Sequence, residues 1–145
     1  MTALPSAEFH YTSAPSYEDL SALTAILNQA NTAAGWPHAN YREVGFFLRD
    51  DQGTAIGGLS GYMLYDWLFV QFLAVPESLR GQGLGEGLLG RAEQFAREHG
   101  GIGMWLDTFE FGPVGYYAKL GFAAVGSIED HPRGSRRLFL QKRFS

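Results

Sequence analysis

The sequence predicts an α/β protein in which helices pack against one mixed sheet. Three observations support this class. Strand-like apolar runs alternate with segments whose apolar residues recur at helical spacing. The most apolar run, Trp67–Val75, is typical of a central strand that is covered on both faces. A glycine-rich junction and an amphipathic helix follow this run directly.

The first half of the chain is expected to hold a short strand, a helix and a hairpin. Glu8–Thr12 fits a short first strand, and Ser16 can cap the helix that follows. The apolar face of that helix comprises Leu20, Leu23, Ile26, Leu27 and Ala30. Asn31–Asn40 breaks the periodicity and predicts a loop. Two strands, Glu43–Arg49 and Thr54–Tyr65, then flank a polar turn, and glycines in the second strand indicate a bulge or a close backbone approach.

The second half alternates helices and strands. A helix is expected after the glycine cluster, because Leu84, Leu88, Ala92 and Phe95 recur at helical spacing before Gly100 ends the pattern. The remaining elements are expected at Ile102–Thr108 (strand), Pro113–Leu120 (helix), Phe122–Ile128 (strand) and Ser135–Phe144 (strand). The order β-α-β-β-β-α-β-α-β-β, without a linker or repeat, predicts a single domain over residues 1–145.

Composition excludes several classes of function. The net charge of −4 argues against a nucleic-acid partner, since such binding depends on neutralising phosphates. The absence of cysteine excludes disulfides, thiolate metal sites and a cysteine nucleophile, so acyl transfer would be direct or use an oxygen nucleophile. The longest apolar run is too short to span a bilayer, and the first residues lack the features of a signal peptide. These patterns predict a cytoplasmic protein with no membrane partner and no metal.

The glycine cluster Arg80–Gly85 is the strongest candidate for a binding site. It lies between a strand and a helix start, where free backbone N–H groups and the helix dipole favour an anion. A P-loop is excluded because no Gly-Lys-Ser/Thr follows. A dinucleotide fingerprint fits formally at Gly85–Gly90, but it would begin inside the helix. Close helix packing is a purely structural alternative.

Two motifs in order carry a resemblance to a known family. Arg80, Gly83 and Gly85 form an Arg-x-x-Gly-x-Gly pattern after the strand end Leu73–Val75, and Gly115–Phe122 is similar to a Phe-Tyr-x-Lys-x-Gly-Phe segment. The chain from Glu8 onward thus resembles the GNAT superfamily of acyl-CoA-dependent N-acetyltransferases, in particular its small bacterial single-domain branch. The resemblance implies a mixed, mostly antiparallel seven-stranded sheet with helices on both faces and a splayed central strand pair.

The resemblance also implies roles for individual residues. The Leu73 amide would point at the thioester carbonyl of acetyl-CoA, and Tyr117 would protonate the leaving thiolate. A phenol suits this task because it keeps its proton at neutral pH. Val75 would pair with the pantetheine arm. The implied coenzyme-binding residues are Leu73, Ala74, Val75, Arg80, Gly81, Gln82, Gly83, Leu84, Gly85 and Glu86. Tyr116 is expected to pack instead of lining the site.

The general base is left open by the sequence. Family members often carry a glutamate or histidine on the strand Trp67–Val75, but here the polar residue is Gln71, which cannot accept a proton. Asp107, Glu110, His131 or an ordered water are the alternatives. The basic residues near the end of the chain are expected to form a solvated strand face or, alternatively, to contact an anionic group. They are Arg133, Arg136, Arg137, Lys142 and Arg143.

The predicted activity is direct acetyl transfer from acetyl-CoA to the primary amine of a small molecule. The aromatic residues expected on the acceptor side favour a compact amine over a peptide, and they are Trp36, Tyr62, Tyr65 and Trp67, with His38 as a further candidate contact. A protein or peptide N-acetyltransferase and a non-catalytic acyl-CoA-binding sensor are the alternatives. A possible homodimer, the acceptor and the acyl-chain preference are open.

Overall fold

The computed structural model describes residues 8–145, which form two compact units divided between His38 and Ala39. The first unit contains α1 (Tyr17–Ala33). Ser16 caps this helix as expected, because its side-chain oxygen accepts a hydrogen bond from the Asp19 N–H at 3.0 Å. The prediction of a single domain over residues 1–145 stays a prediction.

The predicted strand Glu8–Thr12 is wrong, since these residues have no regular secondary structure. A strand exists only through hydrogen bonds to a neighbouring strand, and residues 8–38 contain no other strand. The sheet therefore has six strands instead of the expected seven.

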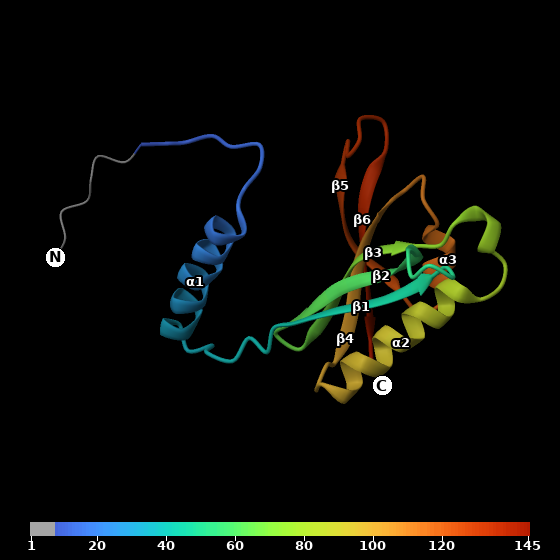
Figure 1. The fold of residues 1–145 in the computed structure, drawn as a ribbon, viewed down its shortest axis with the longest axis horizontal. Helices are drawn as coiled ribbons and strands as arrows, with labels where there is room; N and C mark the ends of the chain where they lie inside the picture. Colours follow the sequence, from blue (N-terminus) through green and yellow to red (C-terminus); the bar gives the residue numbers. More distant parts are fainter. Residues whose placement is uncertain (1–7) are drawn as a thin grey trace. The chain divides into compact units, whose positions relative to one another are not determined.

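The second unit is built on this six-stranded sheet, whose order is β1-β2-β3-β4-β6-β5 (Figure 1). Among the strands of residues 8–145, only β3 and β4 pair in parallel, so the sheet is mixed and mostly antiparallel, as predicted. The strands are β1 (Arg42–Arg49), β2 (Ala55–Leu64), β3 (Trp67–Ala74), β4 (Gly103–Phe109), β5 (Ala123–Glu129) and β6 (Arg136–Arg143). Their bounds lie within a few residues of the predicted ones.

The central pair splays apart, as the family resemblance implied. β3 and β4 pair over three positions, from Trp67 opposite Gly103 to Phe69 opposite Trp105. Beyond them, Val70–Ala74 of β3 and Leu106–Phe109 of β4 run on without pairing to each other. We call the space between these two segments the gap. Successive amides of a strand point to opposite edges, so alternate N–H groups of Val70–Ala74 face the gap without a strand partner.

A β-bulge lies at the start of the gap. Gly61 of β2 opposes Val70 while Ser60 opposes Phe72, so Gln71 is the extra residue of β3. Gly61 is required at this point, because a Cβ atom there would lie 1.9 Å from the Phe69 carbonyl oxygen. The glycines of β2 thus mark both a bulge and a close backbone approach, which the sequence had offered as alternatives.

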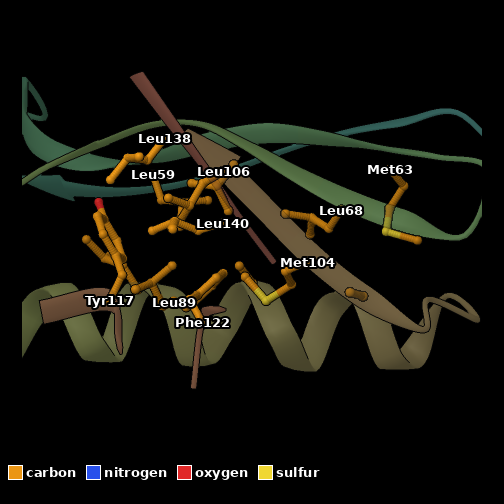
Figure 2. Packing of buried hydrophobic residues seen from close by; sticks show 14 residues of the cluster. Leu59, Met63, Leu68, Leu89, Met104, Leu106, Tyr117, Phe122, Leu138 and Leu140 are labelled. Carbon is orange, nitrogen blue, oxygen red and sulfur yellow. The ribbon is translucent and has the colours of Figure 1, made fainter. Parts of the chain in front are cut away.

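The core of this unit lies between the sheet and α2 (Leu84–Glu98). Figure 2 shows leucines and methionines of the strands packed against this helix, together with Tyr117 of α3 (Val114–Lys119) and Phe122. Fully buried members include Leu59, Met63, Leu68 and Met104. The prediction of helices on both faces is not tested, because α1 belongs to the other unit.

Within residues 8–145, no helix combines the length and the apolar character needed to cross a membrane. The chain between β3 and α2 contains a short 3-10 helix, Glu77–Leu79. Arg80 follows it and donates from Nε to the Val75 carbonyl oxygen at 3.2 Å, which ties the connection to the end of β3.

Candidate active site

The glycine loop between β3 and α2 leaves its backbone accessible. Gly81 and Gly83 have positive φ angles of 80° and 75°, which L side chains rarely adopt, and nothing lies within 4 Å of the position of an added Cβ atom. Gly83 is the N-cap of α2, and no side chain caps the helix there. The first N–H groups of α2 therefore have no intrahelical acceptor, so they are available to an anion.

A cavity of about 770 Å³ adjoins this loop. It is lined by the end of β3, the loop, the first turn of α2 and the start of α3. Every predicted coenzyme residue except Gln82 lines it, and so does Tyr117. The sequence did not anticipate the other lining residues, which are Leu79, Pro113 and Tyr116. The second glycine pattern, Gly85–Gly90, lies inside α2 and not at a strand end, which argues against a dinucleotide turn.

Tyr117 presents its hydroxyl to the cavity although its ring is part of the core. The residue is 8% exposed and packs edge-on against Phe122. Figure 2 shows the ring extending from α3 toward the strands. No group among residues 8–145 hydrogen-bonds this hydroxyl, which retains contact with solvent. Burial, and to a smaller extent Tyr116, raise the pKa of Tyr117 above its usual value. The phenol thus keeps its proton at neutral pH.

Tyr116 has a different place from the one expected. It was predicted to pack, but it is 38% exposed and lines the same cavity. A Cβ atom added at Gly85 would lie 2.6 Å from the Tyr116 hydroxyl oxygen. Burial, with a contribution from Glu86, raises the pKa of Tyr116. Gly85 therefore makes room for this tyrosine beside the helix start, a contact between distant segments that the sequence does not reveal.

Asp107 is one of the three candidate bases and lies beside the gap. Its carboxylate is 18% exposed and accepts from Nε and Nη2 of Arg137 at 2.9 and 2.5 Å. The Arg137 guanidinium also lies 5.9 Å from the ring centre of Phe109 and 5.8 Å from that of Phe139. The pair is thus held among aromatic rings.

The other two candidates have different surroundings. Glu110 forms an ion pair with Arg136, in which both side chains are nearly half exposed. That arginine also approaches Glu129 at 3.9 Å. The His131 ring packs edge-on against Phe109, with centroids 5.5 Å apart. The structure brings Asp107, Glu110 and His131 to the same end of β4, and their roles stay a prediction.

The expectation of a solvated basic face is wrong for Arg137 and Lys142. Both side chains are only about one-third exposed, and each is paired, Arg137 with Asp107 and Lys142 with Glu93 at 2.8 Å. Side chains alternate between the two faces of β6, so Arg137 meets Asp107 of β4 whereas Lys142 meets Glu93 of α2. The sequence alone does not show that β6 lies beside β4.

Two of the predicted acceptor aromatics, Tyr62 and Trp67, lie on one face of the sheet, because Tyr62 opposes Phe69, which is two residues after Trp67. Trp67 and Tyr65 lie at the paired end of β3, where the Trp67 ring covers Gly103 and lies under Arg143. Tyr62 contacts Phe69 with ring centres 5.4 Å apart. Trp36 and His38 belong to the other unit, so their part in an acceptor site stays a prediction.

Comparison with known proteins agrees with this geometry. The family model described as Acetyltransferase (GNAT) family matches residues 9–122. The chain belongs to this family. The splayed strand pair, the bulge and the glycine loop at the start of α2 all lie within the region that the family model matches.

Individual relatives are similar over most of the chain. An acetyltransferase of Agrobacterium fabrum is 36% identical over 115 residues, which cover 79% of this chain and 84% of the relative. The blasticidin-S acetyltransferase of Streptomyces morookaense is 41% identical over 85 residues, covering 58% of this chain and 62% of that enzyme. The crystal structure of an Agrobacterium tumefaciens acetyltransferase superposes with a TM-score of 0.83 at 33% identity, covering 95% and 100% of the two chains.

Proposed function

We propose that this GNAT acetyltransferase moves an acetyl group directly from acetyl-CoA to a primary amine of a small molecule. One observation carries the proposal. The glycine loop, the uncapped start of α2 and the free Tyr117 hydroxyl all line a single cavity beside the gap. An anion-binding backbone and a proton donor are thus within reach of one ligand.

The lining residues fit coenzyme A. The open positions at Gly81 and Gly83 leave room for a pyrophosphate against the backbone, with Arg80 nearby. The free edge of β3 at Leu73–Val75 can pair with the amides of a pantetheine arm, in the manner of an added strand. The coenzyme would supply the activated acetyl group as a thioester.

The reaction then has three needs, and the chain's own groups would serve at least two of them. The Leu73 amide would donate a hydrogen bond to the thioester carbonyl, where negative charge develops when the amine nitrogen attacks. As the new C–N bond forms and the C–S bond breaks, Tyr117 would give its proton to the departing sulfur. The proton that the amine loses passes to solvent or to a base beside the gap, and solvent reprotonates Tyr117.

The small-molecule acceptor rests on two supports. The relative that acts on blasticidin-S is 41% identical over the matched region, although the match spans less than two thirds of that enzyme. Aromatic rings also lie on the other face of the gap, where Phe69 stacks on Trp105 and Phe109 stacks on Phe111. Both features favour a small amine over an extended peptide.

Replacing Tyr117 with phenylalanine tests the proposal most directly. Tyr117→Phe removes one hydroxyl and keeps the ring in the core, so binding of acetyl-CoA should persist. Loss of one positioned acid should lower kcat by roughly 10²- to 10⁴-fold and leave KM for acetyl-CoA nearly unchanged. Thiol release from acetyl-CoA, measured first with a library of primary amines that includes blasticidin S, gives both constants.

Tyr17→Phe is the matched control, because Tyr17 is 85% exposed on α1. It should leave both constants unchanged. Equal turnover by wild type and Tyr117→Phe would contradict the role of Tyr117. Acetyl-CoA binding without transfer to any amine would instead favour the non-catalytic sensor.

A further inference from the structure

Where the gap opens, the two faces of the sheet carry different side chains, with leucines on one face and charged and aromatic residues on the other. Leu106 and Leu138 point into the core with Tyr117. Side chains alternate along a strand, so Asp107 and Phe109 of β4 project from the opposite face. Register places Phe109 opposite Arg137 on β6, on that same face. The coenzyme cavity and this group of side chains therefore lie on opposite faces of one gap.

Asp107 keeps one carboxylate oxygen available on this face. Both hydrogen bonds from Arg137 converge on Oδ1. Within residues 8–145, Oδ2 accepts no hydrogen bond from another group. Arg137 thus fixes the orientation of the carboxylate through Oδ1 and leaves the hydrogen-bonding capacity of Oδ2 unused among the described residues.

Aromatic side chains lie on the same face of the sheet as this carboxylate. Phe69 and Trp105 stack with centroids 4.1 Å apart at the base of the gap, where the β3–β4 pairing ends. Phe72, which is 64% exposed, lies on the same face, since Ser60 and Tyr62 oppose Phe72 and Phe69 along β2. The rings are therefore those of both strands that border the gap.

A second pair of rings extends from the end of β4. Phe109 and Phe111 are parallel within 2°, with centroids 5.1 Å apart. Phe111 is 71% exposed, which is unusual for a side chain that buries so much apolar surface when it is covered. The outer face of this stacked pair is available to another flat ring.

We propose that Asp107 Oδ2 receives the ammonium group of the acceptor, while Phe111 and Phe72 contact a flat ring that carries the amine. The inference rests on the proposed function and narrows its substrate class to cationic amines attached to an aromatic or heteroaromatic body. A carboxylate and aromatic rings on one face of the sheet suit such a ligand, because both attract a cation. An amine that also bears a carboxylate is disfavoured by the charge of Asp107.

Glu110 does not offer the same site. Its carboxylate is nearly half exposed and is engaged by Arg136, and solvent screens such a pair. It nevertheless matches Asp107 in charge and in having an arginine partner. Glu110→Gln is therefore a control for removing a paired carboxylate near the gap.

Calorimetric titration of phenethylamine into the full chain with coenzyme A present tests the proposal. Asp107→Asn should weaken phenethylamine binding about tenfold or more, since a hydrogen bond to a charged group is lost. Glu110→Gln should change it less than twofold. Cyclohexylethylamine, which has the same chain and a saturated ring, should bind wild type more weakly.

Phe111→Leu provides a second variant whose folding is secure, because the side chain is exposed. It should reduce the preference for phenethylamine over cyclohexylethylamine. Equal affinities for the two amines in wild type, or equal losses in Asp107→Asn and Glu110→Gln, would overturn the proposal. If the protein binds phenethylamine through Asp107 but releases no thiol from acetyl-CoA, the proposed amine site is supported and only the proposed function is contradicted.

Discussion

The two sides of the gap are built in different ways. The proposed coenzyme side comes mainly from one continuous stretch, Leu73–Glu86, whose glycines expose backbone groups. The proposed acceptor side comes from side chains of three separate strands, including Phe72, Asp107 and Arg137. In the proposed function, backbone groups would recognise what all acyl-CoA molecules share, whereas side chains would select among amines. Substitutions on the first side should therefore affect every acceptor equally, and those on the second should depend on the amine.

The largest effect is expected on the coenzyme side at Gly83. Gly83→Val places a β-branched residue at a φ of 75° and fills the space beside the free N–H groups of α2. The rise in melting temperature that acetyl-CoA causes in wild type should disappear. Gly90→Ala is the control, since its added Cβ meets nothing and its φ is ordinary. A full acetyl-CoA response in folded Gly83→Val would refute the loop assignment.

An intermediate effect is expected from the contact between Gly85 and Tyr116. Gly85→Ala would push the Tyr116 hydroxyl out of place and raise KM for acetyl-CoA several-fold. Tyr116→Phe removes that oxygen, and the nearest remaining ring atom is 3.5 Å from the added Cβ. The double variant should therefore bind acetyl-CoA better than Gly85→Ala alone. Additive effects in this double-mutant cycle would mean that the contact does not shape the cavity.

The smallest effect is expected at Glu93, which borders neither side of the gap. Hydrogen bonding to Lys142 holds the pKa of Glu93 below its usual value, and Arg97 adds to this. The ionised form therefore stabilises the fold above the usual glutamate pKa, and this contribution is lost as the pH falls through the lowered value.

Glu93→Gln should accordingly cost within about 1 kcal/mol at neutral pH. Its melting temperature should approach that of wild type as the pH is lowered toward about 3, below the ordinary glutamate pKa. The Michaelis constants for acetyl-CoA and for the amine should stay unchanged. A change in either constant would mean that the Glu93–Lys142 ion pair affects binding at the gap.

The sequence predicted the coenzyme side far better than the acceptor side. Arg80, Gly83 and Gly85 follow each other within six residues, so their spacing alone indicates an anion-binding turn. Asp107 could be named as a candidate, but its arginine partner lies thirty residues away on a strand whose neighbour the sequence does not specify. Such contacts depend on which strands are neighbours and on the register between them, and local sequence patterns do not predict either.

The wrong predictions for Glu8–Thr12 and Tyr116 have the same cause, because both depend on contacts between distant segments. Glu8–Thr12 has the composition of a strand, but pairing is a property of two segments, and residues 8–38 contain no second strand. Tyr116 was assigned to packing from its position on the helix beside Tyr117. Its hydroxyl instead lies next to Gly85, because the start of α2 reaches α3 in space.

The short ladder between β3 and β4 has a consequence for how such enzymes can diverge. Three paired positions suffice to hold the strands together, and the edge of β3 beyond them offers main-chain groups that every residue type possesses. Side chains on this edge can be exchanged over generations while the acetyl donor is retained. If Asp107 holds the amine as proposed, a new acceptor would require changes at only a few positions around it, and the fold would not have to be rebuilt.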